Sequence, residues 1–366
     1  MIERRKTRTV MKGNVPVGSD HPVSIQTMTK VDTSDVEKTV DEIRRLSAAG
    51  AEIVRVSVPG AQAAKAIAEI KPQVSVPIVA DIHFSPALAL KAIEAGADCI
   101  RINPGNIGKH VEAIKDICRR CKDKGISMRI GGNEGSIMER KGIEVVEHDT
   151  DPVVKMVDEV LKNCEILEGQ GFRDIVVSVK SHDPLETIRA YTLIAGQCDY
   201  PLHVGVTHAG TIEQATIKTA VAFGALLSRG IGDTIRVSIT GDPADEVRVG
   251  REILQCLGMR KRGMEVYACP SCGRADVDVI KLTAEVEEVV KGLNLDVRVA
   301  VMGCEVNGPG EAAQADIGIA AGRGWGYIMQ KGRILEKVEA DHLAAALKTH
   351  ILRMKEEGLI AVSEEP

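Results

Sequence analysis

Short apolar runs alternate with amphipathic stretches of helical period over the first 260 residues of the chain. Each apolar run is four to eight residues long and rich in Val and Ile, which is typical of a buried strand. The sequence therefore predicts eight strands. The predicted strands are Val23–Met28, Ile53–Val58, Ile78–Asp81, Cys99–Ile102, Ser127–Ile130, Asp174–Val179, Leu202–Val206 and Thr234–Ile239.

A helix is predicted after every one of these strands. Two of the helices are followed by the same short pattern, in which a glycine (Gly50 or Gly96) ends the helix before the next strand. Eight strand–helix units in about 250 residues favour a closed (β/α)8 TIM barrel over residues 1–260. An open doubly wound sheet is the alternative, but no G-x-G-x-x-G motif follows the first strand. The predicted helices are Asp35–Ala48, Ala61–Ile70, Pro86–Ala95, Lys109–Lys124, Asp151–Glu168, Asp183–Ile194, Thr211–Arg229 and Asp245–Leu257.

The alternation stops after Leu257, where residues 258–263 have the glycine-rich, basic composition of a linker. The remaining residues, 264–366, predict a small α+β domain. Its predicted elements are a strand at Val266–Cys269, a helix at Asp278–Gly292, strands at Val297–Met302 and Ala315–Ala320, a glycine hairpin at Gly322–Gly332 and a final helix at Ala340–Glu357.

Composition narrows the class of protein. The net charge is −5 and only 2% of residues are aromatic, so neither a nucleic-acid surface nor base-stacking platforms are expected. There is no apolar run long enough to cross a membrane, and the first residues lack the apolar segment of a signal peptide. A cytoplasmic protein is expected, in which nine cysteines favour metal binding or catalysis over disulfides.

Polar side chains gather at the carboxyl ends of the predicted strands, where a barrel carries its active site. Five strands place a cation there, and such a ring of charge repels itself unless an anion neutralises it. A solvated rim explains any one of these cations, but five around one ring predict a small substrate with more than one phosphoryl group. The candidate substrate-binding residues are Arg55, Asp81, His83, Arg101, Asn103, Arg129, Asn133, Lys180, Thr207, Arg236 and Ser238.

Three cysteines near the end of the chain form a second candidate site. Cys269 and Cys272 flank Pro270 and Ser271, and Cys304 follows after 31 intervening residues. No fourth Cys or His lies in this segment, so the site has three thiolates with either an open position or an oxygen ligand, Glu305 or Glu311. A structural zinc knuckle and an iron–sulfur cluster both remain open on this spacing.

These motifs resemble the bacterial 4-hydroxy-3-methylbut-2-enyl diphosphate synthase family of the non-mevalonate isoprenoid pathway. The resemblance runs over nearly the whole chain. The most specific stretches are residues 22–29, 100–108, 202–207, 269–274, 301–312 (VMGCEVNGPGEA) and 315–320.

The resemblance implies a TIM barrel followed by a domain with a [4Fe–4S] cluster held by Cys269, Cys272, Cys304 and Glu311. It also implies the two-electron reductive ring opening of 2-C-methyl-D-erythritol 2,4-cyclodiphosphate, with ferredoxin or flavodoxin as electron donor. A carboxylate binds iron more weakly than a thiolate does, so Glu311 would give way to a substrate oxygen and is a catalytic candidate as well.

One position departs from the family's usual pattern. The family usually has Thr-Glu-Ala-Gly after the seventh strand, and this chain has Thr207-His208-Ala209-Gly210. Imidazole also carries out acid–base chemistry near neutral pH, so His208 is a candidate catalytic residue.

The linker predicts how the two sites meet. The eighth helix of a barrel returns to the face opposite the mouth, and six linker residues span about 20 Å only when fully extended. A head-to-tail homodimer, in which the cluster domain of one chain covers the barrel of the other, is therefore expected, and the resemblance implies the same arrangement. Two rival functions are a phosphate-binding synthase of the pterin-synthase kind with a zinc-stabilised appendage, and a zinc-knuckle binding module on a barrel scaffold.

Overall fold

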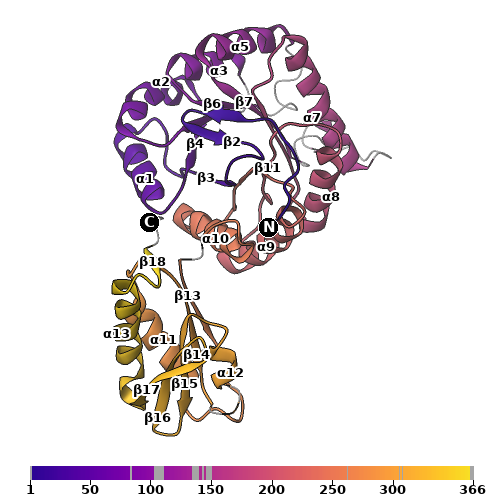
Figure 1. The fold of residues 1–366 in the computed structure, drawn as a ribbon. Helices are drawn as coiled ribbons and strands as arrows, with labels where there is room; N and C mark the ends of the chain where they lie inside the picture. The colour runs from indigo at the N-terminus through magenta and orange to yellow at the C-terminus, as the bar shows by residue number, and fades with distance from the viewer. Residues whose placement is uncertain are drawn as a thin grey trace. The chain divides into compact units, whose positions relative to one another are not determined.

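The chain divides into two compact units, residues 1–260 and residues 261–366. The computed structural model describes residues 2–82, 85–102, 111–133, 140–141, 144–145, 151–261, 263–304, 306 and 308–362. Figure 1 shows a ring of helices around strands in the first unit, and a sheet with helices beside it in the second. No helix in these residues is long and apolar enough to cross a membrane.

The first unit is a parallel barrel, which confirms the predicted fold class (Figure 1). Its eight strands pair side by side in the order β10-β7-β6-β5-β4-β3-β12-β11. A single parallel bridge between Val177 and Leu202 brings the two ends of that order together. The strands are β3 (Ser24–Met28), β4 (Ile53–Val58), β5 (Ile78–Ile82), β6 (Cys99–Ile102), β7 (Ser127–Asn133), β10 (Ile175–Lys180), β11 (His203–Val204) and β12 (Thr234–Ile235).

Four helices of the barrel begin after an aspartate that caps the N-terminus of the helix. The side chains of Asp35, Asp151, Asp183 and Asp242 each accept a backbone N–H of the first turn. In the last three of these helices a proline follows at once, and its fixed φ suits the first helical position. The helices are α1 (Val36–Ala48), α2 (Ala61–Ile70), α3 (Pro86–Glu94), α5 (Val111–Lys124), α7 (Pro152–Gly169), α8 (Pro184–Ala195), α9 (Ile212–Leu227) and α10 (Pro243–Cys256).

The apolar core lies between the strands and the helices, because alternate strand residues point outward. Several inward-facing side chains of this barrel are charged, among them Asp81, Arg101 and Arg129, whereas the interior of this fold is normally filled by Val, Ile and Leu. Here a small apolar cluster of Val17, Ile53, Val79 and Cys99 closes the amino-terminal end of the barrel. Val17 belongs to a hairpin, β1 (Val10–Lys12) and β2 (Val15–Val17), which the sequence reasoning did not predict.

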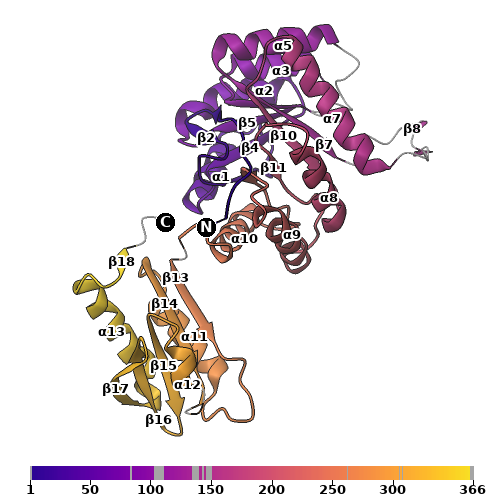
Figure 2. The same ribbon diagram turned by 45° about the vertical axis from the view of Figure 1, so that its right-hand side comes forward.

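The second unit is a mixed sheet in the order β13-β14-β15-β16-β17, with β18 (Ala361–Val362) paired to β14. Helices α11 (Val279–Val290) and α13 (Leu343–Glu356) pack on one face of this sheet (Figure 2). The short helix α12 (Gly308–Ala312) packs on the other face through Ala312. The strands are β13 (Met264–Ala268), β14 (Leu295–Met302), β15 (Ile317–Gly322), β16 (Trp325–Gln330) and β17 (Arg333–Glu339).

One expectation for the second unit was wrong. The segment Gly322–Gly332 is not a simple glycine hairpin: it contains strand β16, with a tight turn on either side. Gly324 and Gly332 supply the positive φ values, 77° and 80°, that these turns require. Strand β17 and helix α12 were also absent from the expectation. Helix α12 is only five residues long, and β17 is almost entirely exposed. Neither therefore shows the apolar period that identifies a buried element.

Candidate functional site

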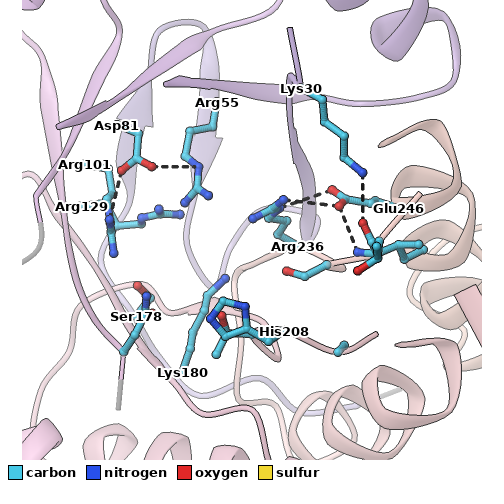
Figure 3. A pocket seen from close by; sticks show the side chains of 16 residues that line it. Lys30, Arg55, Asp81, Arg101, Arg129, Ser178, Lys180, His208, Arg236 and Glu246 are labelled. Carbon is cyan, nitrogen blue, oxygen red and sulfur yellow. Dashed lines mark hydrogen bonds and ion pairs between the residues drawn. The ribbon is translucent and has the colours of Figure 1, made fainter. Parts of the chain in front are cut away.

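A cavity of about 330 Å³ opens at the carboxyl ends of the barrel strands. It is lined by ten of the residues that the sequence analysis proposed, so the fold brings these side chains together (Figure 3). His83 and Asn103 lie outside the described residues. The ten are Arg55, Asp81, Arg101, Arg129, Asn133, Lys180, Thr207, His208, Arg236 and Ser238.

Asp81 on β5 is the centre of the first group of side chains in this cavity. Its Oδ1 lies 3.1 Å from Nη1 of Arg101, and its Oδ2 lies 3.7 Å from Nε of Arg55. The parallel register pairs Asp81 with Arg101, and Arg101 with Arg129, so these inward side chains lie at one level of the barrel. One buried carboxylate therefore holds two guanidinium groups against the cavity wall.

Arg236 forms the second group with Glu246, which lies in the first turn of α10. Two guanidinium nitrogens of Arg236 approach the two oxygens of Glu246, each at 3.3 Å. Glu246 also accepts the backbone N–H of Ile239 at 3.1 Å and the hydroxyl of Thr27 at 2.9 Å. Four donors thus stabilise a carboxylate that is only 1% exposed.

Two glycines make room for long cationic side chains inside the barrel. A Cβ atom at Gly131 would lie 2.6 Å from Oγ of Ser178 and 3.4 Å from Nε of Arg101. A Cβ atom at Gly205 would collide with Nζ and Cε of Lys180. Because a side chain at Gly131 would displace Ser178 and one at Gly205 would displace Lys180, we interpret both glycines as part of the site.

Arg129 and Lys180 have no carboxylate partner among the described residues, although they are only 1% and 7% exposed. Burial and the neighbouring Arg101 lower the pKa of Arg129 to about 10, so that it still carries its charge at neutral pH. Burial and the surrounding arginines, first of all Arg129, lower the pKa of Lys180 well below its usual value. The cavity therefore contains buried positive charge that an anion would stabilise.

Thr207 and His208 reach the cavity from the turn that follows β11. His208 has a left-handed backbone with φ of 51°, and Gly210 follows with φ of 106°. Histidine is one of the residues enriched in this region of backbone space. The turn directs the imidazole toward the same cavity as Lys180 (Figure 3).

Four polar lining residues were missed by the sequence reasoning: Lys30, Ser178, Thr240 and Glu246. Lys30 follows the first strand by two residues, so the search of strand ends would have found it had that strand been included. Ser178 is an inward residue one pleat before Lys180. Glu246 comes from a helix rather than a strand end, and no sequence pattern marks it as part of the site.

A second cavity, of about 430 Å³, lies in the second unit. Cys269, Cys272, Cys304 and Glu311 all line it, whereas Glu305 lies outside the described residues. The backbone N–H of Gly303 donates to Sγ of Cys269 at 3.3 Å, so this sulfur already has one hydrogen-bond donor.

The backbone around the cysteines holds the thiols in place. Ser271 has a left-handed backbone with φ of 53°, in the turn that joins Cys269 to Cys272. Glu311 lies on α12, which directly follows the loop of Cys304. Within the described part of the chain, no three His, Cys, Asp or Glu side chains lie close enough together to ligate one metal ion. The four side chains instead surround a larger space.

Two domain profiles of one family match this chain, one in each of its two units. The profile of the GcpE TIM-barrel domain matches residues 7–251, and that of the GcpE protein C-terminal domain matches residues 265–353. The chain belongs to the GcpE family. This confirms the resemblance on which the expectations for the site were built.

Curated relatives cover both units. A 4-hydroxy-3-methylbut-2-en-1-yl diphosphate synthase (flavodoxin) of Caldanaerobacter subterraneus subsp. tengcongensis is 51% identical over 358 residues, which are 98% of this chain and 100% of the relative. A protein of the same name from Nocardia farcinica is 48% identical over 367 residues, covering 100% of this chain and 94% of the relative.

Solved structures resemble the barrel more distantly. A variant of Plasmodium falciparum HPPK-DHPS with pterin and p-hydroxybenzoate matches at a TM-score of 0.50 with 12% identity. The match covers 69% of this chain and 48% of that chain. At this identity the likeness concerns the fold alone.

Proposed function

We propose that this chain is a 4-hydroxy-3-methylbut-2-enyl diphosphate synthase. It opens the ring of 2-C-methyl-D-erythritol 2,4-cyclodiphosphate and uses two electrons and two protons to give (E)-4-hydroxy-3-methylbut-2-enyl diphosphate and water. The observation that carries the proposal is the pairing, in one chain, of a cationic barrel cavity with a cavity of three thiols and a carboxylate. Relatives of this name match over the whole length.

The barrel cavity supports a doubly charged diphosphate as substrate. Six cationic side chains and two carboxylates line it among the described residues. Guanidinium groups donate paired hydrogen bonds that match phosphate oxygens, and Lys180 adds a point charge. Ser178, Thr207 and Ser238 supply neutral donors on the same wall. We infer that His208, which lines the same cavity beside Thr207, holds a proton near the substrate.

The thiol cavity fits a [4Fe–4S] cluster better than a single zinc ion. A tetrahedral zinc site needs its ligands within about 2.0–2.3 Å of one point, whereas a cluster spreads its four ligands over a cube. Cys269, Cys272, Cys304 and Glu311 would hold the cluster, and the Gly303 N–H would stabilise one thiolate. When bound, the cluster would supply the two electrons of the reaction.

The electron donor follows from the names of the relatives. Those names specify flavodoxin, so we infer that a flavodoxin reduces this chain, with ferredoxin as the alternative donor. Both are small soluble redox proteins, and their use implies a cytoplasmic enzyme.

The start of the linker supports assembly as a homodimer. Nη2 of Arg260 donates to the carbonyl of Val23 at 3.0 Å and lies 2.7 Å from Oε2 of Glu52. Val23 and Glu52 immediately precede β3 and β4, so the linker begins at the amino-terminal end of the barrel, opposite the substrate cavity. We infer that the cluster domain covers the barrel of a partner chain rather than that of its own.

Anaerobic reconstitution tests the proposed function. The full chain, rebuilt with iron and sulfide, should be brown, contain about four iron and four sulfide per chain and convert the cyclodiphosphate when reduced flavodoxin is present. A colourless protein that binds one zinc ion and does not turn over the cyclodiphosphate would instead support the pterin-synthase-like reading or the binding module.

A further inference from the structure

The cationic side chains of the barrel cavity are not equivalent. Arg55 and Arg101 share Asp81, and Arg236 is paired with Glu246. Lys30 reaches the cavity rim and donates to the backbone carbonyls of Ile239 and Gly241. Among the described cations that line the cavity, only Arg129 and Lys180 are buried without a carboxylate partner, so in the unliganded barrel no anion stabilises the charged form of either group.

Lys180 lies at the centre of this charge. Its Nζ is packed against the backbone at Gly205, where a side chain would collide with it. Every strand around it contributes a charged or titratable group. The groups that face this region are Lys12 on β1, Arg55 on β4, Asp81 on β5, Arg101 on β6, Arg129 on β7, Tyr191 on α8, His203 on β11, His208 after β11, Arg236 directly after β12, Glu246 on α10 and Lys30 after β3.

An arginine cannot relieve this repulsion, because its guanidinium does not lose its proton in a protein. A lysine can, and a buried lysine among cations is destabilised in its charged form. Burial is the main cause of the lowered pKa of Lys180. The charges of Arg129, Arg236, Arg55 and Arg101 lower this pKa further. The two carboxylates in the cavity are already occupied by arginines.

We propose that Lys180 is an uncharged amine in the unliganded barrel and takes up one proton from solvent when the diphosphate binds. The amine, the proton and the anion combine to give an ammonium group hydrogen-bonded to phosphate oxygen, and no other bond changes. This inference rests on the proposed function, because it assigns the protonation step to the binding of that substrate.

Uptake of a proton by Lys180 makes the affinity for the diphosphate depend on pH. Below the pKa of Lys180 in the unliganded protein, the lysine is already charged and affinity does not depend on its titration. Above that value, each bound diphosphate costs a proton, so the affinity falls as the pH rises, by up to about tenfold per pH unit. The fall ends once the pH passes the higher pKa of the lysine in the complex.

Titration calorimetry in buffers of different ionisation enthalpy measures the proton directly. The oxidised, cluster-loaded full chain would be titrated anaerobically with the cyclodiphosphate, without reductant, so that it binds without turnover. This ligand is a good probe because each of its phosphorus atoms carries one ester bond and one anhydride bond, which leaves no phosphate proton that titrates near neutral pH. At about pH 7.5 we expect uptake of about one proton per site, seen as a slope in a plot of binding heat against buffer enthalpy.

Three variants assign that proton. Lys180→Met should bind more weakly but with little or no proton uptake. Lys180→Arg keeps a fixed charge in a similar volume and should also bind without uptake, which covers the case in which the methionine variant folds poorly. Lys12→Met is the control: Lys12 is fully buried with a pKa of about 8, but it does not line the cavity, so its loss should leave the uptake unchanged.

Two results would overturn the proposal: binding to the wild-type chain with no dependence on buffer, or wild-type uptake in both Lys180 variants, which would move the proton to His203 or His208. Failure of the cyclodiphosphate to bind would count against the proposed function instead. Sulfate, which also does not titrate near neutral pH, then serves as the probe. Proton uptake with sulfate that depends on Lys180 would keep the inference, and sulfate binding without uptake, or no sulfate binding, would end it.

Discussion

Oδ1 of Asp81 lies 3.1 Å from Nη1 of Arg101, and both residues are more than nine-tenths buried. The two occupy partner positions on adjacent parallel strands, so the register of the sheet sets the contact. A buried ion pair of this kind is weak evidence for stability, but removing one partner leaves an uncompensated charge.

Asp81→Asn should destabilise the unliganded protein. The change leaves Arg55 and Arg101 without their shared carboxylate, which costs about 3–5 kcal/mol for a buried pair. Urea denaturation should show a lower free energy of unfolding, and saturating cyclodiphosphate should restore part of it.

The control for Asp81 is Asp199→Asn, which removes the partner of Arg8 at a carboxylate that is 61% exposed. That change should cost less than about 1 kcal/mol. Equal losses in the two variants would contradict the view that Asp81 is the electrostatic centre of the cavity.

Removing a cation from the cavity should weaken substrate binding. For Arg55, Arg101, Arg129, Lys180 or Arg236 changed to Met, we expect a loss of about 1.5–3 kcal/mol, or about ten- to a hundredfold in affinity, in direct binding measurements. Arg189→Met, on an exposed ion pair with Asp151 outside the cavity, is the matched control and should bind normally. Unchanged affinity in all five variants would exclude the cavity as the diphosphate site.

Cys304→Ser, like Cys269→Ser or Cys272→Ser, should remove the cluster and all turnover but leave the barrel folded. The reason is that the thiols lie in the second compact unit, whose core is separate from that of the barrel. Iron and sulfide analysis with circular dichroism checks both parts. Cys256→Ser is the control, since Cys256 is exposed at the end of α10 and away from the thiol cavity. Full activity in Cys304→Ser would refute the ligand assignment.

Glu311→Ala should behave differently from the cysteine variants. Three thiolates would still hold a cluster, but a labile one that loses iron, and turnover should be severely reduced. Absorbance decay and iron content under argon measure this lability. Normal iron content and activity here, with loss in Glu305→Ala instead, would transfer the fourth ligand to Glu305.

Mixing two defective chains, assayed at a cyclodiphosphate concentration too low for the Arg101 variant to bind it, tests the cross-chain arrangement. Cys304→Ser lacks the cluster and Arg101→Ala lacks a substrate contact, so a hybrid dimer should contain one doubly defective site and one intact site. Turnover should reappear after subunit exchange. A mixture that stays inactive after verified exchange, or an active enzyme that sediments as a monomer, would show that each chain completes its own site.

Much of the fold was predictable because its elements are local. The eight strands and eight helices have apolar periods that a short window of sequence contains, and their observed bounds differ from the predicted ones by only a few residues. The largest differences are at β11 and β12, which the structure ends after two residues each. The candidate thiol site could also be predicted from the sequence, because two of its three cysteines lie within four residues of one another.

The hairpin of β1 and β2 could not be predicted from local sequence patterns. Its residues Val10 and Val17 are buried only because the hairpin packs against the amino-terminal end of the barrel, where Val17 contacts a cluster from β4, β5 and β6. Three-residue strands carry too few positions to show an alternating pattern. Their existence depends on a surface that forms from residues more than thirty positions away.

The sequence by itself determined the (β/α)8 order, the cations at the strand ends and the three thiols, because each is a property of neighbouring residues. Only the tertiary structure decided which cations are neutralised. Asp81 meets Arg55 and Arg101 across strand register, and Glu246 reaches Arg236 from the first turn of α10. Lys180 and Arg129 remain without a carboxylate partner among the described residues. Charge pairing in a barrel depends on which residues share a level of the sheet. Strand pairing, rather than separation along the chain, sets the distance between two such residues.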